Sequence, residues 1–377
     1  PLSAPPEEID ASIETLAGWM YIAVWEELHP SLRFGAGDRM PDPAAFREYL
    51  TGLRNHGKKP EASDHLDRAL EIDPNFEQLR FYLAFAPWGI QSWASSDAML
   101  ISLEDRRSEL NPSQQRLLDG IRWGLDGRWS TALGAFRQYM ADHPEQCVGE
   151  AMVVFSGVYA NRPRAALEAY DRFCADPVMP DTMPKVIALL AADAYHLVGE
   201  HEKELDLLRD LSAREETFQG ILWVREAEAG ALVALGRIDE CRALLATALT
   251  EPAHWPTRYG EMLVEVAAEF HAHGHEAASL EVAQQALDWF DSNEFSPNFS
   301  ARIKRYSLSA LSLAGLHEEA MQLATSMLEE HPDWWGVRAV LGVSAARTGD
   351  RSRAFAASRQ LATVDAVSYT HLRAHET

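Results

Sequence analysis

The sequence contains little cysteine, and this shortage excludes two classes of protein. Only three cysteines occur among 377 residues, at Cys147, Cys174 and Cys241. They are too few and too scattered for a disulfide framework or a cysteine-based zinc site. We expect them to be small buried side chains in a reducing compartment, the cytoplasm.

Positive charge and long apolar runs are also scarce. The chain has 34 basic and 57 acidic residues, a formal net charge of -23, and this excess of negative charge repels phosphate backbones and anionic lipids. The most apolar early stretch, residues 16–25, is about half as long as a membrane span requires and is flanked by acids. We therefore expect neither a nucleic-acid partner nor a membrane.

The usual catalytic motifs are missing from the sequence as well. It has no P-loop and no Gly-x-Ser-x-Gly turn, and the His-Glu pairs that begin at His201, His275 and His317 each lack the second histidine of a zinc protease motif. The sequence therefore predicts neither an enzyme nor a cofactor.

The densest histidine group is His271, His273 and His275 beside Glu276. Such residues are potential metal ligands. Residues two apart point to different sides of a helix, however, and Gly274 turns the chain in the middle of the group. We expect a solvated turn here and no metal site.

What the sequence does contain is an internal repeat. Turn-forming residues recur at intervals of 32 to 41 residues: Gly57, Gly89, Gly127, Asn161, Gly199, Gly236, Gly274, Gly315 and Gly349. A small side chain stands five residues after the turn in eight of the nine cases, and proline follows several units, at Pro74, Pro112, Pro144, Pro177, Pro252 and Pro332. This pattern predicts a helix, a tight turn, a second helix and a stop.

These features resemble the tetratricopeptide repeat (TPR) family, most closely in residues 60–74 (PEASDHLDRALEIDP) and 129–144 (WSTALGAFRQYMADHP). The resemblance covers residues 43–366. It implies an all-α fold, a right-handed superhelical solenoid of about nine TPR-like helix-turn-helix repeats. Three features depart from the pattern: Pro87 inside a first helix, Glu204 in place of a small residue, and an insertion at 292–299.

The two ends of the chain differ from the repeats. Residues 1–42 are predicted to form a capping helix (7–28) and a connector (31–42), while residues 367–377 resemble translated adaptor sequence and are expected to be a non-native tail. Residues 45–76 and 110–144 resemble repeat regions that follow a kinase, cyclase or winged-helix domain in bacterial signalling proteins. Since the first residue is Pro1 rather than methionine, we expect the chain to begin inside a longer protein.

The TPR resemblance also implies which residues face a partner, because the first helix of each repeat lines the concave groove in this family. Counting from the turns gives one set of groove candidates: Asp193, His196, Trp223, Glu226, Glu261, His271, Arg302, Arg305 and Ser309. Some co-chaperones of the family bind a peptide carboxylate through paired lysines and asparagines. The corresponding positions hold Leu189, Glu226, Val264 and Arg305, so a chaperone tail is not the expected ligand.

Arg302, Lys304 and Arg305 form a basic spot in this acidic sequence. Arginine binds carboxylates through two parallel hydrogen bonds, so the spot fits an acidic segment of a partner. The other interpretation is a solvated helix face that neighbouring acids balance.

We therefore expect a protein-interaction scaffold or a sensory and regulatory repeat domain that binds a peptide or protein segment in its groove. Two alternatives stay open. One is a helical-repeat enzyme that uses dispersed acids and histidines such as Asp193, His196 and Glu226. The other is a sensor that binds a small ligand in an apolar pocket along the groove.

Overall fold

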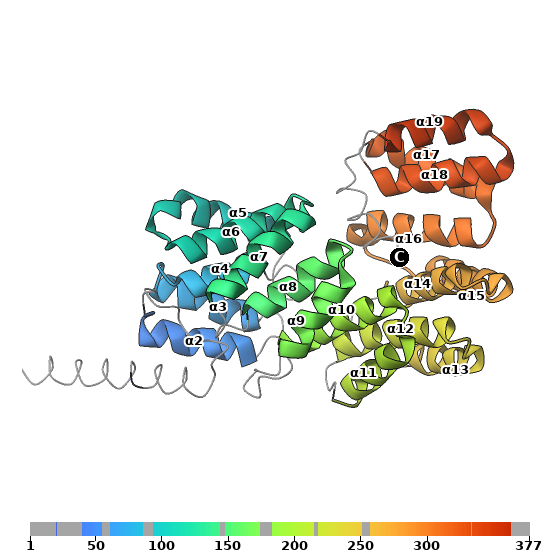
Figure 1. The fold of residues 1–377 in the computed structure, drawn as a ribbon. Coiled ribbons are helices and arrows are strands. Elements are labelled where there is room, and N and C mark those ends of the chain that lie inside the picture. The colour runs from blue at the N-terminus through green and yellow to red at the C-terminus, as the bar shows by residue number, and fades with distance from the viewer. Residues whose placement is uncertain are drawn as a thin grey trace, which may run out of the picture. The chain divides into compact units, whose positions relative to one another are not determined.

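The computed structural model describes most of the chain: Met20 and residues 40–54, 61–85, 93–143, 148–173, 183–214, 218–250, 257–332 and 334–362. The predicted capping helix at 7–28, apart from Met20, the predicted tail at 367–377 and the turns at Gly57 and Gly89 lie outside these residues. The chain divides into two compact units within one helix, between Ala191 and Ala192. Each unit is described by itself (Figure 1).

The first unit consists of helix pairs. Its helices are α2 (Pro43–Arg54), α3 (Glu61–Ile72), α4 (Glu77–Phe85), α5 (Trp93–Asp105), the short 3-10 helix η2 (Arg107–Glu109), α6 (Pro112–Leu125), α7 (Trp129–Asp142), α8 (Val148–Tyr159), α9 (Pro163–Phe173) and the first part of α10 (Met183–Val198). The contacting pairs are α2 with α3, α4 with α5, α6 with α7, and α8 with α9.

The second unit continues the same arrangement. Its helices are the end of α10, α11 (His201–Arg214), α12 (Phe218–Ala234), α13 (Ile238–Ala248), α14 (Arg258–Ala272), α15 (Glu276–Ser292), the 3-10 helix η3 (Pro297–Phe299), α16 (Ser300–Leu313), α17 (His317–Glu330), α18 (Trp335–Thr348) and α19 (Arg351–Leu361). Helices α12, α14, α16 and α18 lie in a row, each in contact with the next (Figure 1).

The predicted fold class is confirmed: the described residues form nine α-helix pairs of the TPR-like helix-turn-helix kind and no strand. The predicted insertion is also present, because α15 extends to Ser292 and residues 293–299 then form a connector that ends in η3. None of the described helices combines the length and the apolar character that a membrane span requires.

The turns inside the helix pairs form as the sequence predicts. At the end of α12, Gly236 has a φ of 71°, a left-handed conformation that glycine adopts without steric cost. The N–H of Arg237 donates to the carbonyl of Leu232 at 2.8 Å, and the N–H of Gly236 donates to Val233 at 2.9 Å, which together make a Schellman motif. All described turn residues of the series have positive φ: Gly127, Asn161, Gly199, Gly236, Gly274, Gly315 and Gly349.

Small residues let the two helices of a pair pack closely. The positions five residues after the turn are completely buried at Ala132, Ala166, Cys241, Ser279 and Ala320. Prolines play two roles, since Pro74 and Pro332 follow α3 and α17 as predicted, whereas Pro112 opens α6. Proline fits there because the first helical N–H has no partner within the helix.

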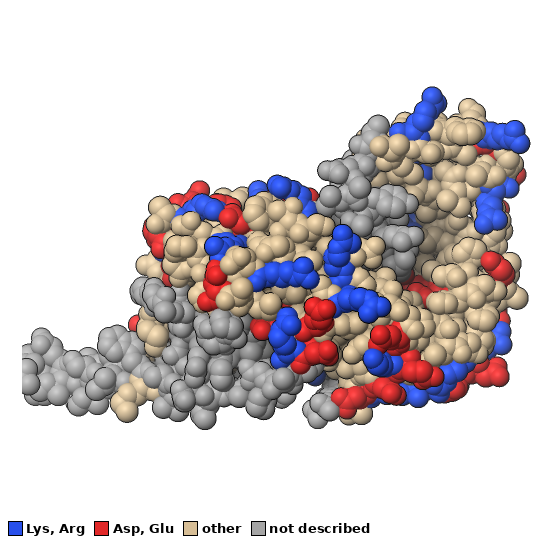
Figure 2. All heavy atoms as spheres, in the orientation of Figure 1, with Lys and Arg blue, Asp and Glu red and all other residues tan. Residues whose placement is uncertain are grey.

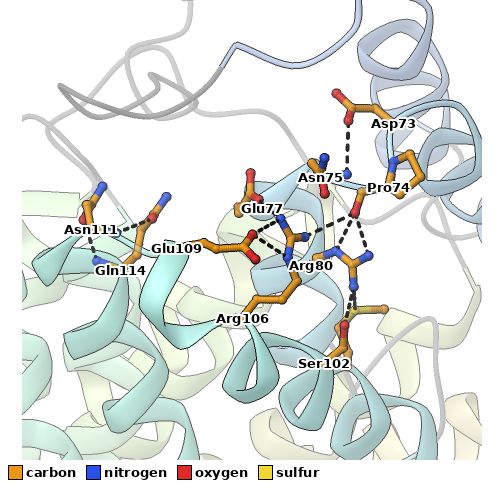
Figure 3. Close-up of polar contacts among 11 residues, drawn as sticks. Asp73, Pro74, Asn75, Glu77, Arg80, Ser102, Arg106, Glu109, Asn111 and Gln114 are labelled. Carbon is orange, nitrogen blue, oxygen red and sulfur yellow. Dashed lines mark hydrogen bonds and ion pairs between the residues drawn. The ribbon is translucent and has the colours of Figure 1, made fainter.

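Polar contacts hold the turn between α3 and α4 in the first unit (Figure 3). Asp73 is 3% exposed, and its carboxylate accepts a hydrogen bond from the backbone N–H of Asp42 at 2.9 Å. Arg80 donates to the carbonyl of Pro74 at 2.6 Å, and Arg106, which follows α5, reaches the same oxygen at 3.5 Å. These bonds join two successive helix pairs at one turn.

Candidate functional site

The predicted groove residues lie in the second unit, on α10, α12, α14 and α16. The structure brings six of the nine into one neighbourhood: Asp193, His196, Trp223, Glu226, Glu261 and Arg302. His271, Arg305 and Ser309 do not join them. His271 is exposed and contacts Glu276 at 2.9 Å, Arg305 is exposed, and Ser309 is half-buried.

Glu261 on α14 is the centre of an ionic network. Its side chain is completely buried, and its carboxylate accepts two hydrogen bonds from the guanidinium of Arg302 on α16, one of them at 2.6 Å from Nη2. The hydroxyl of Thr257 donates to Glu261 at 2.6 Å, and Nη1 of Arg258 lies 3.6 Å from Oε2. A buried carboxylate needs such partners because losing its hydration is costly.

Arg258 links this network to α12. Its Nη2 lies 2.7 Å from Oε2 of Glu226, and only 8% of the Arg258 side chain is exposed. The guanidinium also lies over the ring of Trp223, 5.7 Å from its centroid, a cation–π contact. Trp223 itself is 38% exposed, so the network is continuous with an accessible aromatic surface.

The basic spot predicted on α16 is neutralised by acids. Arg302 binds Glu261, and Nζ of Lys304 lies 3.3 Å from Glu330 on α17. Two of the three basic groups therefore already have carboxylate partners within the chain. This arrangement corresponds to the second interpretation of the spot, a helix face balanced by neighbouring acids.

Five carboxylates gather on α10, α12 and α14. Glu261 is buried, and the other four form what we call the acidic surface: Asp193, Glu226, Glu265 and Glu269. Burial, followed by repulsion from Glu226, raises the pKa of Glu265 to about 8. Asp193 is exposed, and repulsion from Glu204, followed by Glu226 and Glu269, raises its pKa above the ordinary value. Both shifts mean that the surface resists carrying its full negative charge.

The raised pKa of Glu265 predicts a pH dependence of stability. Its pKa is about 8 in the folded chain against 4.5 as the ordinary value, so the folded state holds a proton that the unfolded state releases between these values. The free energy of unfolding contributed by Glu265 is then full below pH 4.5 and declines as the pH rises toward 8. Urea unfolding over this pH range should show a smaller decline for Glu265→Gln than for the wild type. Glu281→Gln, an exposed change on α15, is the control and should leave the decline unchanged, and equal slopes in all three proteins would contradict the assignment.

Next to the acidic surface, three histidines and two glutamates from three helices meet. His196 lies in the last turn of α10, His201 and Glu204 lie in the first turn of α11, and Glu269 lies in the last turn of α14, which His273 directly follows. Nδ1 of His196 lies 3.1 Å from Glu204, and Nδ1 of His201 lies 3.0 Å from the same carboxylate. On its other side, Nε2 of His196 lies 3.4 Å from Oε2 of Glu269, and Nε2 of His273 lies 3.5 Å from that oxygen.

A glycine lets α10 and α14 reach each other across α12. A Cβ atom at Gly230 of α12 would lie 3.4 Å from Cγ and 3.7 Å from Cδ of Glu269. The side chain of Glu269 therefore lies directly on the backbone of α12, from where it reaches His196. A large side chain at position 230 would occupy this path.

The two glutamates favour the charged form of His196. Burial opposes protonation of His196, but its contacts with the carboxylates of Glu204 and Glu269 outweigh it and raise its pKa to about 10. For Glu269, burial opposes ionisation, but the contact with His196 lowers its pKa. Burial lowers the pKa of His273, although Glu269 opposes this shift. The space between Glu204 and Glu269 therefore favours a positive charge.

Sequence reasoning missed His201, Glu204, Arg258, Glu265, Glu269 and His273 as site residues. One signal was available: Glu204 occupies a position at which five other repeats bury a small residue, and Glu204 itself is only 2% exposed. Departures of this kind from a structural pattern concentrate at functional sites. The residues of the predicted histidine group separate, since His273 turns toward His196 while the ring of His275 lies against Phe270, 6.1 Å between centroids.

The three residues of the alternative enzyme hypothesis lie near one another, but His196 and Glu226 also contact other charged groups. His196 contacts Glu204 and Glu269, and Glu226 contacts Arg258. Asp193 is close enough to His196 for its charge to act on it.

Comparisons with known proteins give similar solved structures only. No protein-family model and no curated protein sequence matches the chain. A tetratricopeptide repeat protein from Parabacteroides merdae ATCC 43184 is similar at 12% identity and a TM-score of 0.41, over 71% of this chain and 99% of that one. The apo form of RapI is similar at 11% identity and a TM-score of 0.48, over 84% and 97%. Cut9 in the APC/C hetero-tetramer Cut9-Hcn1 gives 13% identity and a TM-score of 0.36, over 96% and 82%.

Proposed function

We propose that the chain is a protein-interaction scaffold whose acidic surface binds a peptide or protein segment that carries lysine or arginine side chains. The observation that supports this proposal is the surplus of carboxylates on α10, α12 and α14. Arg258 and Arg302 balance Glu226 and Glu261. Among the described residues, Asp193 and Glu265 form no ion pair, although the charge of Arg258 acts on Glu265 from a distance. A cationic segment would supply the missing charge.

The second helices of the repeats in this unit, such as α11, α13 and α15, are called the outer helices here, and their charge pattern differs from that of the acidic surface. Acidic and basic side chains alternate over α11 and α13 (Figure 2), and many are paired: Arg237 with Glu240 at 2.6 Å, Arg209 with Glu240 at 3.4 Å, and Arg242 with Glu281 at 2.9 Å. Exposed pairs of this kind satisfy each other's charge and give little net field. The unbalanced charge is thus on the side of the first helices of the repeats.

Trp223 gives the acidic surface an apolar contact beside its charges. Its ring is 38% exposed, and Arg258 covers one side of it. Aromatic side chains with one accessible side are frequent anchors in protein interfaces. We therefore expect the bound segment to combine basic residues with at least one apolar residue.

Selection from a random peptide library on the purified chain tests this function. Peptides rich in lysine and arginine should be enriched, and their affinity should fall about tenfold, equivalent to about 1.4 kcal/mol, in the double variant Asp193→Asn with Glu265→Gln. The matched control removes two acids from the outer helices, Glu240→Gln with Glu281→Gln, and should bind like the wild type. Enrichment of acidic or neutral peptides, or an equal loss in both double variants, would show that the acidic surface is not the binding site.

A further inference from the structure

The geometry points to a binding site for a divalent transition metal ion, with zinc as the best fit, formed by Nε2 of His196, Nε2 of His273 and the carboxylate of Glu269. The three donor atoms lie within 4.8 Å of one another. They come from two helices that are two repeats apart. Of the three, only Glu269 also belongs to the acidic surface, and the variants that test peptide binding, Asp193→Asn with Glu265→Gln, leave all three in place. Imidazole nitrogens exclude calcium and magnesium as the preferred ions and favour zinc and its neighbours in the first transition series.

The two distances from Glu269 to the histidines match the size of the ion. Oε2 of Glu269 lies 3.4 Å from Nε2 of His196 and 3.5 Å from Nε2 of His273. Ligand atoms bound about 2.0–2.1 Å from a tetrahedral zinc ion are about 3.3–3.4 Å apart. The same oxygen is buried and makes no hydrogen bond of good geometry among the described residues. A metal ion bound between the three donor atoms would have this oxygen as a ligand.

Glu204 and His201 form the layer behind the ligands. Nδ1 of His196 lies 3.1 Å from both oxygens of Glu204, which is only 3% exposed and also contacts Nδ1 of His201 at 3.0 Å. These are hydrogen-bond distances, shorter than the separation of two zinc ligands. A histidine that binds a metal through one nitrogen commonly donates the N–H of the other to a carboxylate, which fixes the ring.

The site is accessible and has room for a further ligand. The exposed fractions of the side chains are 25% for His196, 23% for Glu269 and 29% for His273, so an ion can enter from solvent. Three protein ligands leave the fourth tetrahedral position for water or for a group from a bound partner. The ion would also join the ends of α10 and α14 across Gly230.

Metal titration of the full chain tests the site. After treatment with a chelator, the chain should bind a single tight equivalent of Zn²⁺ in competition with a chromophoric chelator, and Co²⁺ should give the visible absorption of a tetrahedral nitrogen and oxygen site. His273→Ala and Glu269→Gln should each lower the affinity by more than about 100-fold, since loss of an outer-layer partner alone costs about 10- to 100-fold. Zn²⁺ should raise the unfolding temperature of the wild type but not of His273→Ala.

His271→Ala is the matched control, because it removes an exposed histidine from the same end of α14 and should bind Zn²⁺ like the wild type. Circular dichroism of each variant shows whether it folds, and Glu269→Gln keeps the shape of the side chain. The proposal is overturned if the wild type binds no tight equivalent, if His273→Ala and Glu269→Gln bind as tightly as the wild type, or if His271→Ala loses as much affinity as they do.

Discussion

Replacement of Glu261 by alanine is expected to lower the free energy of unfolding by about 3–5 kcal/mol, because it breaks a buried ion network by removing one partner. Arg258, with 8% of its side chain exposed, would keep Glu226 but lose its second carboxylate. Arg302 and the hydroxyl of Thr257 would lose the acceptor that both share. Urea unfolding followed by circular dichroism measures the loss, and hydrogen exchange locates it at α14 and α16.

Two further variants separate charge from packing at this position. Glu261→Gln keeps the shape and part of the hydrogen bonding, so its loss should lie between those of the wild type and Glu261→Ala. Glu281→Ala removes one partner of an exposed pair with Arg242, half of whose side chain is accessible, and should cost less than about 1 kcal/mol. If Glu261→Ala were as mild as Glu281→Ala, the network would not contribute to stability.

Replacement of Phe136 by alanine is expected to destabilise the first unit by about 3–5 kcal/mol, since it leaves a cavity in a packed core. The ring is 1% exposed and lies over Gly120 of α6, where an added Cβ would come within 2.4 Å of Cε1. Gly120→Ala should therefore also destabilise, by about 1–3 kcal/mol, even though alanine favours a helix over glycine by about 1 kcal/mol.

When the two changes are combined, the effect of Gly120→Ala on the free energy of unfolding is expected to change sign. In a chain that already carries Phe136→Ala, the ring is gone, and Gly120→Ala should stabilise by about 1 kcal/mol through helix propensity and partial filling of the cavity. A double-mutant cycle from urea unfolding measures the coupling. Additive effects, with Gly120→Ala destabilising in both backgrounds, would show that glycine at this position does not serve the packing of Phe136.

Local chemistry made the repeat architecture predictable. A positive φ is costly for most residues, so glycine marks the turn, and the turns at Gly127, Gly199 and Gly236 are found where the spacing places them. Small residues such as Ala132 and Ala166 are fully buried because two helices approach at those points. These constraints act within one helix pair, so they can be recognised in the sequence of a single repeat.

The candidate site was only partly predictable, because its contacts form between helix pairs rather than within one pair. Asp193, His196, Glu226, Glu261 and Arg302 all lie on the first helix of a repeat, at positions that could be counted back from the turns. That Arg302 of α16 binds Glu261 of α14 depends on how one helix pair stacks on the next. The sequence pattern does not contain this stacking.

By itself, the sequence determined the all-α class, the helix pairs and their turns, because steric limits on the backbone and the burial of small residues operate over short segments. Only the tertiary structure decided that the side chain of His273 contacts His196 and Glu269, whereas those of its sequence neighbours His271 and His275 do not. The stacking of helices two repeats apart, over the glycine at position 230, brings these groups together. Contacts of that range depend on the rotation between successive repeats, which no local spacing of residues specifies.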